Sequence, residues 1–479
     1  MGQYLAFDLG AESGRAISGV LSGSSLAVEE LHRFPNNPIR EGSSIYWDTD
    51  RLWREIRRGM DIAVRERKLT LDGIGVDTWG VDFAMIDADG KLVGRPRHYR
   101  DPRNQSAMAK VFEFVPREDV FGYTGIQFMQ INTLYQLYAM KMAGEDALSA
   151  GHRLLNIPDL LNFWLTGVAK SEMTIASTTQ FFNPASMTWA SELLQRLGLP
   201  GEILCHLVPP GTLLGKTIEE PFTNVYASAG HDTASAVVAV PAERGDNWCY
   251  ISSGTWSLMG LEMDRPVIDP QSLALNFTNE VGAGGKIRLL KNIAGLWLLQ
   301  ECRRAWMAEG TEYSYEQLTQ IAAEARPFTA VLNPDAFLEP GEMPRKITEH
   351  CGVRAPGSHG EFARTILESL ALRYRHVLES LETLGNRKIE VIHIVGGGSR
   401  NVLLNQFVAD CTGRRVIAGP TEATAIGNIL VQAMGAGELK NLDEARAVVR
   451  ASFPPAAIEP RPSAEWEKAY GDYREMVGR

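Results

Sequence analysis

Residues 3–23 read QYLAFDLGAESGRAISGVLSG: an apolar run, a short polar turn with glycines, and a second apolar run. Apolar positions alternate through the second run, which predicts β-strands on both sides of a tight turn. Residues 247–264 read NWCYISSGTWSLMGLEMD and repeat this order of strand, small polar turn and strand. We therefore expect a duplicated core, with one copy near residues 1–90 and another near residues 247–290.

Helical segments are expected between and after these strands. Residues 48–67 carry Leu52, Ile56, Met60 and Val64 at four-residue spacing, the pattern of an amphipathic helix. Residues 104–220 and 292–385 are predicted to be mostly helical. Asp89-Gly90 predicts a β-hairpin turn. The mixture of strand-rich and helix-rich blocks predicts an α/β fold.

The chain length predicts more than one domain. With 479 residues, we expect an N-terminal domain over 1–243 and a C-terminal domain over 244–440. The polar stretch 240–247 is the expected linker. Residues 441–479 are expected to form a peripheral tail.

Composition excludes several classes of function. The net charge of −10 argues against a broad nucleic-acid interface, which would be basic. The cysteines show neither C-x-x-C nor zinc-site spacing, and their odd number fits a reducing cytosol; they are Cys205, Cys249, Cys302, Cys351 and Cys411. The N-terminus lacks the features of a signal peptide, and no apolar run is long enough for a transmembrane helix. A cytoplasmic protein without a membrane partner is expected, and its oligomeric state stays open.

Three glycine loops follow apolar strands and could bind phosphate. They are Gly10–Arg15 (GAESGR), Ser252–Thr255 (SSGT) and Gly396–Ser399 (GGGS). Glycine allows close backbone approach, and successive N–H groups form an anion site. Each loop alone is better explained as an ordinary hairpin turn, and only the three together favour a phosphate site. The P-loop and dinucleotide-binding patterns are absent, which disfavours both of those folds. The arrangement resembles the actin/hexokinase type, with two similar ribonuclease H-like domains and a nucleotide in the cleft between them.

Several longer stretches carry a more specific resemblance. They are DLGAESGR (8–15), GVDTWGVDF (75–83), GIQFMQINTLYQL (125–137), HDTASAV (231–237), ISSGTWSLMG (251–260), LLKNIAGLWLLQ (289–300), HIVGGGSRN (393–401) and RVIAGPTEATAIGN (415–428). On these motifs the chain resembles the FGGY family of carbohydrate kinases, within it the branch that acts on L-rhamnulose. The resemblance implies transfer of the ATP γ-phosphate to the 1-hydroxyl of L-rhamnulose, in L-rhamnose degradation.

The resemblance also implies site residues, matched position by position. The ATP contacts would be Ala11, Glu12, Ser13, Gly14, Arg15, Thr255, Gln300 and Gly397. The sugar contacts would be Gly80, His231, Asp232, Thr233 and Asn292. Glu12 departs from the small polar residue usual in this branch, and its charge would repel a phosphate unless the side chain points away. Asn292 and Gln300 are expected on one helix, eight residues apart and on roughly one face.

Asp232 is the expected catalytic base. Phosphoryl transfer to an alcohol needs a group that accepts the hydroxyl proton, and a carboxylate can do so. Asp232 lies among small residues at the start of a predicted helix. Without the resemblance, an ordinary helix-capping aspartate would be the better explanation. Asp8 is assigned to Mg²⁺, or else caps a turn. Asp77 or Asp82 could bind sugar hydroxyls, and Trp79 could stack on the sugar or belong to the core.

Other functions stay open at this point. The same chemistry could act on another ketose or polyol, such as fuculose, xylulose or glycerol. An actin-like ATP-binding protein that phosphorylates no small molecule is a second alternative, and a non-catalytic sugar-binding regulator is a third. Dependence of ATP consumption on added sugar would separate the first two classes.

Overall fold

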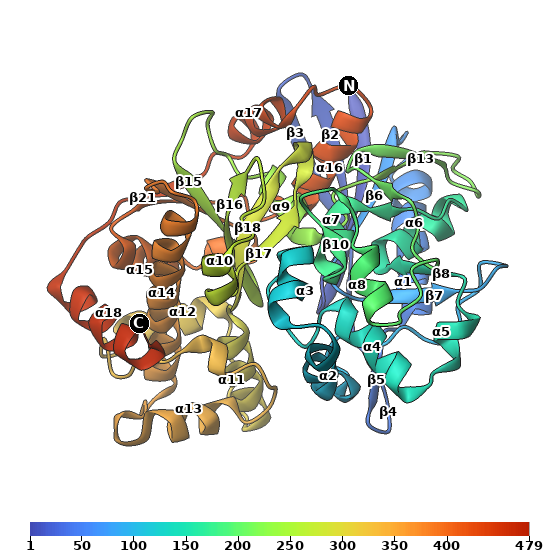
Figure 1. Ribbon diagram of the computed structural model, residues 1–479. Helices are drawn as coiled ribbons and strands as arrows, with labels where there is room; N and C mark the ends of the chain where they lie inside the picture. Colours follow the sequence, from blue (N-terminus) through green and yellow to red (C-terminus); the bar gives the residue numbers. More distant parts are fainter. Residues whose placement is uncertain (479) are drawn as a thin grey trace. The chain divides into compact units, whose positions relative to one another are not determined.

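The computed structural model describes residues 1–478, which form two compact units (Figure 1). Unit 1 comprises Met1–Ala239, Glu262–Leu289 and Ala423–Ser452. Unit 2 comprises Val240–Leu261, Leu290–Glu422 and the chain from Phe453 onward. Each unit takes three separate segments of the chain. The linear domain boundaries expected at 243/244 and 440/441 stay a prediction.

The elements of unit 1 are numerous. Its strands are β1 (Gly2–Leu9), β2 (Ser13–Ser22), β3 (Ser25–Pro35), β4 (Ile39–Glu41), β5 (Ser44–Tyr46), β6 (Gly73–Thr78), β7 (Phe83–Ile86), β8 (Arg153–Asn156), β9 (Ser171–Glu172), β10 (Phe182–Asn183), β11 (Thr188–Trp189), β12 (Leu207–Val208), β13 (Thr212–Lys216), β14 (Asn224–Ala227) and β17 (Thr278–Val281). Its α-helices are α1 (Thr49–Asp61), α2 (Ala107–Phe114), α3 (Arg117–Thr124), α4 (Thr133–Ala143), α5 (Asp146–Ala150), α6 (Ile157–Thr166), α7 (Met173–Ala176), α8 (Ser191–Arg196), α9 (Asp232–Val238), α10 (Pro270–Ala274), α16 (Ala423–Gly435) and α17 (Leu442–Ser452).

Unit 2 also combines β-strands with α-helices. Its strands are β15 (Trp248–Ser253), β19 (Val391–Val395), β20 (Arg415–Ala418) and β21 (Ala456–Ile458), while β16 (Trp256–Met263) and β18 (Ile287–Ala294) each include residues of both units. Its α-helices are α11 (Trp297–Ala308), α12 (Tyr315–Glu324), α13 (Met343–Cys351), α14 (His359–Leu384), α15 (Val402–Thr412) and α18 (Ala464–Val477).

The main sheet of unit 1 has the order β13-β14-β6-β1-β2-β3. β1 and β2 form the strand–turn–strand unit that the sequence predicts, and β3 continues it as an antiparallel meander. β6 runs parallel to β1, and β14 runs parallel to β6. The predicted helix at 48–67 is present as α1, which a π-helical turn extends over Ile62–Glu66; Asp48 accepts a hydrogen bond from Arg51 N at 3.0 Å and caps α1. The Asp89-Gly90 hairpin is also present, with Gly90 at a φ of +80°.

Helices cover both faces of this sheet. Alternate residues of β6 point to opposite faces, so Ile74 and Val76 join the core cluster that includes α1 and α6, whereas Gly73 and Gly75 face α16. α16 also crosses α9 very closely. A Cβ added to Gly427 of α16 would lie 1.8 Å from the carbonyl oxygen of Ser235, so only glycine fits there.

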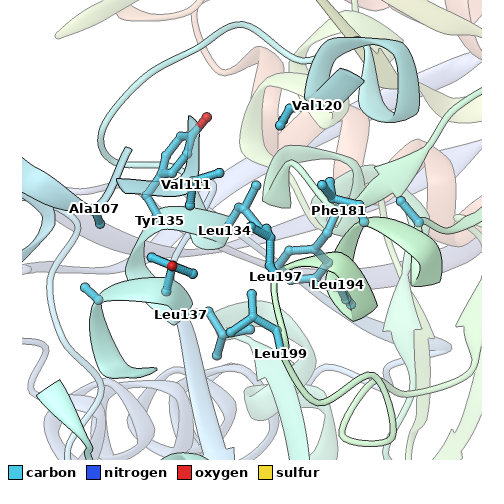
Figure 2. Close-up of a cluster of buried hydrophobic side chains, with 14 of the residues drawn as sticks. Ala107, Val111, Val120, Leu134, Tyr135, Leu137, Phe181, Leu194, Leu197 and Leu199 are labelled. Atoms are coloured by element: carbon cyan, nitrogen blue, oxygen red, sulfur yellow. The ribbon is translucent and has the colours of Figure 1, made fainter. Parts of the chain in front are cut away.

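A helical layer completes unit 1. Figure 2 shows apolar side chains of α2, α4 and α8 that converge on one buried cluster, together with Phe181. Leu134, Leu137 and Phe181 are fully buried in it. These helices lie in the stretch 104–220 that the sequence predicts to be mostly helical, although short strands and turns interrupt it.

The sheet that contains β15 has the order β17-β18-β16-β15-β19-β20-β21. β15 and β16 are antiparallel, β19 and β20 run parallel to β15, and β21 is antiparallel to β20. In unit 2 the long helix α14 contacts α12, α15 and α18 (Figure 1). The residues beyond 440, for which a peripheral tail stays a prediction, form α17, β21 and α18. α17 contacts β3, and β21 is the last strand of the sheet that contains β15.

The structure can be compared with the expectations about membrane helices and cysteines. No helix within residues 1–478 combines the length and the apolar composition that crossing a bilayer requires. The five cysteines are all free thiols, as expected for a chain without an internal disulfide set.

Candidate functional site

In unit 1, three chain segments meet at the ends of parallel strands. Asp8 of β1 and Asp77 of β6 are paired across the two strands. Thr78 N donates to the carbonyl oxygen of Gly230 at 2.9 Å, and Thr78 is bridged to His231. The sequence motifs around residues 8, 77 and 231 therefore share one edge of the sheet. This carboxyl edge is where open α/β sheets bind their ligands.

Asp232 is the accessible carboxylate of this edge. It is the first residue of α9, and its Oδ1 accepts hydrogen bonds from Thr233 N at 2.5 Å and Thr233 Oγ1 at 3.1 Å. Its side chain keeps 30% of its surface exposed, against 9% for Asp8. The expected helix start is thus confirmed, with Asp232 in the first turn rather than at the N-cap. A carboxylate there remains reachable by a substrate.

Asp77 differs from Asp232 in being completely buried. Its Oδ2 accepts a hydrogen bond from Asn428 Nδ2 of α16 at 2.5 Å. Burial raises the pKa of Asp77 well above its usual value, and the negative charges of Asp8 and Asp232 raise it further. Asp77 is therefore poorly placed to accept a sugar proton.

The first glycine loop connects β1 to β2. Gly10 N donates to the carbonyl oxygen of Ser13 at 2.9 Å, which closes the turn. Arg15 forms an ion pair with Asp8. Ala11 and Ser13 are half-buried, and the side chain of Glu12 is exposed. A Cβ added to Gly14 would lie 2.3 Å from the ring of Phe34, so packing requires this glycine whatever it binds.

Gly80 lies in a short strained segment after β6. The next residue, Val81, has a φ of +68°, a conformation that a β-branched residue rarely adopts. Thr178 Oγ1 accepts a hydrogen bond from Val81 N at 3.1 Å, and Thr133 Oγ1 donates to Val81 O at 2.6 Å. A Cβ on Gly80 would lie 3.4 Å from His231 Nε2, so Gly80 and the imidazole are neighbours. Strain of this kind is typical of ligand-binding segments.

Asp82 and Trp79 belong to the core rather than to an open site. Asp82 is fully buried and accepts hydrogen bonds from Trp47 Nε1 at 2.5 Å, Trp79 Nε1 at 2.9 Å, Tyr99 N at 3.2 Å and Gln136 Nε2 at 2.9 Å. Burial raises the pKa of Asp82 to about 7 although these donors favour its ionised form. The ring of Trp79 lies 3.9 Å from that of Trp47 and is 5% exposed. The suggestion that Asp82 or Trp79 contacts sugar gains no support.

Unit 2 contains the other two glycine loops. The turn after β15 has Gly254 N donating to Trp256 O at 2.9 Å. The first turn of α11 is fastened to it, because Trp297 N donates to Thr255 O at 3.1 Å. Thr255 itself is half-buried. Gln300, one turn further along α11, has a buried Oε1 without a hydrogen-bond partner among the described residues.

The third loop follows β19. It forms a 3₁₀ turn over Gly397–Arg400, and helix α15 begins two residues later at Val402. A Cβ on Gly398 would lie 2.0 Å from Ser253 Oγ, whereas a Cβ on Gly397 would meet nothing within 4 Å. Gly397 is exposed. Its backbone is therefore accessible, while Gly398 serves close packing.

One prediction about this region is wrong. Asn292 and Gln300 do not share a helix: Asn292 lies on strand β18, and Gln300 lies on α11. The apolar run around them satisfies either period, and Gly295 interrupts it. A Cβ on Gly295 would lie 2.5 Å from Ser257 Oγ, so the chain turns there in close contact with β16.

Sequence reasoning missed three buried residues that support the loop around His231. Glu172 accepts a hydrogen bond from Gly230 N at 2.9 Å. Glu280 and Arg288 both contact His231 Nδ1, at 3.2 Å and 3.1 Å. All three are distant in sequence from residue 231. A charged residue inside an otherwise apolar strand, such as Arg288 in IRLLKNIA, is the signal that could have drawn attention to them.

Comparison with known proteins identifies the family of the chain. The model for the N-terminal domain of the FGGY family of carbohydrate kinases matches residues 3–239, and that for the C-terminal domain matches residues 249–436. The chain is 45% identical to the rhamnulokinase of Bacteroides thetaiotaomicron over 99% of each chain. It is 39% identical to the rhamnulokinase of Bacillus subtilis over 96% of this chain and 95% of that one.

Solved structures support the fold. The xylulose kinase of Lactobacillus acidophilus superposes with a TM-score of 0.81 at 15% identity, covering 99% of this chain and 98% of that one. The glycerol kinase of Plasmodium falciparum, solved with ADP, superposes with a TM-score of 0.78 at 14% identity, covering 100% and 98%. The actin/hexokinase-type fold expected from the sequence is thus confirmed, and the chain belongs to the FGGY family of carbohydrate kinases.

Proposed function

We propose that this protein transfers the γ-phosphoryl group of ATP to the 1-hydroxyl of L-rhamnulose, giving L-rhamnulose 1-phosphate and ADP. The full-length similarity to rhamnulokinases supports the choice of sugar. One observation supports the chemistry: the carboxylate of Asp232 is accessible, whereas the neighbouring carboxylates are buried. The reaction belongs to L-rhamnose degradation.

Asp232 acts as the general base in this proposal. The sugar hydroxyl loses its proton to the carboxylate as the oxygen attacks the γ-phosphorus. Asp77 cannot take this role, because it is buried and bound to Asn428. Asp82 cannot take it either, because four donors already bind its oxygens.

Sugar and nucleotide would contact different sets of residues. Gly80, His231, Thr233 and Asn292 would bind the sugar. Ala11, Glu12, Ser13, Gly14, Arg15, Thr255, Gln300 and Gly397 would bind ATP. ATP could form a hydrogen bond with the buried Oε1 of Gln300, which has no partner among residues 1–478. It could also bind the accessible backbone of Gly397.

Mg²⁺ would be held at Asp8. Residues 1–478 contain no group of three or more histidine, cysteine, aspartate or glutamate side chains arranged to hold a metal. A single carboxylate fits Mg²⁺ that arrives with the nucleotide, since this ion keeps several waters and takes most other ligands from phosphate oxygens. When bound, the ion would neutralise charge on the transferred phosphoryl group. Arg15, paired with Asp8, would add a second positive charge.

The test is release of ADP from Mg-ATP by the purified full chain, with L-rhamnulose, L-fuculose, D-xylulose and glycerol offered separately. We expect turnover that depends on sugar, with L-rhamnulose giving the highest kcat/KM. A higher value for another substrate would contradict the assigned sugar but leave the kinase chemistry intact. ATP hydrolysis that no sugar accelerates would contradict the kinase proposal and favour an actin-like ATP-binding protein.

A further inference from the structure

Two buried charged residues approach His231 from the side opposite Asp232. Arg288 of β18 has no exposed surface, and Glu280 of β17 is nearly as buried. Arg288 Nη2 donates to Glu280 Oε2 at 3.0 Å and lies 3.1 Å from His231 Nδ1. The other ring nitrogen, Nε2, lies 3.5 Å from Asp232 Oδ1. The imidazole thus stands between a buried ion pair and the proposed catalytic base.

The guanidinium of Arg288 favours a proton on the ring nitrogen that lies away from it. An arginine side chain has only donors and stays charged in proteins, so Arg288 Nη2 forms a hydrogen bond with Nδ1 only when Nδ1 carries no proton. A neutral imidazole whose Nδ1 accepts from Arg288 carries its proton on Nε2. A doubly protonated imidazole, with Nδ1–H directed at Glu280, also carries a proton on Nε2. In these two states Nε2–H is the group presented to Asp232. A neutral imidazole with its proton on Nδ1 would instead donate to Glu280 Oε2, at 3.2 Å, and would lose the hydrogen bond from Arg288.

The ion pair is itself held firmly in unit 1. Arg288 Nε donates to Val281 O at 3.2 Å. Val281 N donates to Ser177 Oγ at 2.9 Å, which ties β17 to the segment that supports Gly80. Both hydrogen bonds of Val281 thus hold the ion pair on the Nδ1 side of the imidazole.

Stability alone is a poor reason for such a pair. A buried arginine–glutamate pair is often no more stabilising than apolar residues of similar size. Arg288 Nη1, moreover, is buried without a hydrogen-bond partner among residues 1–478, which adds to the cost. A pair kept at this cost, in contact with a residue next to the proposed base, has a role in the site.

We propose that Arg288 and Glu280 are positioning residues, which keep His231 Nδ1 as the anchored nitrogen and so direct Nε2–H toward Asp232 and the sugar. The proposal rests on the proposed function for its effect on catalysis. Its statement about the imidazole stands on the geometry of unit 1 alone.

The first test reads the imidazole directly. The full chain is labelled with ¹⁵N-histidine, and the His231 signals are assigned by their loss in His231→Gln. We expect neutral His231 to be protonated at Nε2 in the unsubstituted protein and to change to the Nδ1–H form in Arg288→Met. An Nδ1–H form in the unsubstituted protein would overturn the proposal, even if Arg288→Met fails to fold. An unchanged form in folded Arg288→Met would overturn it too.

The second test reads catalysis with a matched control. Arg288→Met should lower kcat with L-rhamnulose by about 10- to 100-fold, as loss of an orienting partner typically does, while the KM for ATP stays within about twofold. The control Arg364→Met breaks an arginine–glutamate pair in α14 that is partly buried, where Arg364 Nε lies 2.7 Å from Glu368 Oε1, and should change neither constant. An unchanged kcat in Arg288→Met would reject the positioning role.

The two proposals fail in different ways. If the unsubstituted protein releases no ADP in response to L-rhamnulose, the proposed function fails, and the ¹⁵N measurement still decides how His231 is anchored. If sugar-dependent release is present but Arg288→Met leaves both kcat and the imidazole unchanged, only the positioning role fails.

Discussion

The two large sheets share one strand order, but the ends of their paired strands carry different side chains. The order β3-β2-β1-β6-β14-β13 of one sheet corresponds to β18-β16-β15-β19-β20-β21 of the other. In the first, the paired strand ends carry Asp8 and Asp77; in the second, Ser252 is paired with Val395. The same scaffold thus presents carboxylates in one unit and small neutral groups with glycine loops in the other.

This difference suits a division of labour between the units. Carboxylates can accept a proton or bind a cation. A neutral edge with exposed backbone, as at Gly397, avoids repelling an anionic nucleotide. Substitutions can therefore alter the acidic edge of unit 1 (Asp8, Asp77 and Asp232) and the neutral edge of unit 2 (Ser252–Thr255 and Gly396–Ser399) separately.

The largest effect is expected at the acidic edge. Asp232→Asn keeps the shape of the side chain but removes the proton acceptor, so kcat should fall by about 10²- to 10⁴-fold. Coupled ADP release with saturating L-rhamnulose and Mg-ATP measures it. Asp89→Asn, in the exposed hairpin turn, is the matched control and should leave kcat unchanged. A variant Asp232→Asn that retains more than about a tenth of the activity would remove the general-base role.

A pH effect on stability is expected from Asp82. Burial raises its pKa from 3.8 to about 7, so the folded state holds this proton more tightly than the unfolded chain. The contribution is complete below about pH 4 and is lost as the pH rises toward 7, which lowers the free energy of unfolding by up to about 4 kcal/mol.

The control for this pH effect is Asp82→Asn, which cannot titrate. Urea unfolding from pH 4 to 8, followed by tryptophan fluorescence, should show a shallower fall in Asp82→Asn than in the unsubstituted protein. Asp82→Asn should also be less stable at pH 5, since its amide brings an extra donor to a site that already holds four. Parallel pH profiles for the two proteins would contradict the shifted pKa.

A smaller effect is expected at the neutral edge, where two adjacent glycines should behave differently. Gly398→Ala forces a Cβ to within 2.0 Å of Ser253 Oγ, and overpacking of this kind costs about 1–3 kcal/mol of stability. Gly397→Ala meets nothing within 4 Å and should leave the melting temperature unchanged. Thermal unfolding compares the two variants. Equal destabilisation would show that the third loop is not packed as described.

The smallest effect is expected at Gly80. A Cβ there would lie 3.4 Å from both His231 Nε2 and Thr178 Cγ2, an ordinary contact that the fold tolerates. If sugar binds beside Nε2, Gly80→Ala should raise the KM for L-rhamnulose by about tenfold, the effect of roughly 1.4 kcal/mol, and leave the KM for ATP unchanged. Steady-state kinetics with each substrate varied in turn measures both constants. An unchanged sugar KM would place the sugar elsewhere.

Local features of the fold could be predicted from the sequence. The strand-turn-strand units at 3–23 and 247–264, the helix α1 and the hairpin at Asp89-Gly90 depend on neighbouring residues, and periodicity reports on those. The pairing of β6 beside β1, and of β19 beside β15, depends on contacts across long stretches of chain. No local pattern reports such contacts.

The candidate site shows the same limit. The HDTAS motif indicated Asp232, and its place at the start of α9 was predicted correctly. Asn292 was assigned to a helix because an apolar run fits a buried strand as well as a helix. Glu280 and Arg288 were missed because only the tertiary fold brings them to His231.

The position of α16 also has a consequence for biosynthesis. Unit 1 depends on this helix, since Asn428 binds Asp77 across 351 residues of sequence and Gly427 lies against Ser235. A ribosome delivers these residues only after most of unit 2 has been made. A nascent chain that ends near residue 240 therefore carries the catalytic motifs but exposes the apolar sheet face that α16 covers. We expect such a fragment to need a chaperone until α16 (Ala423–Gly435) has emerged.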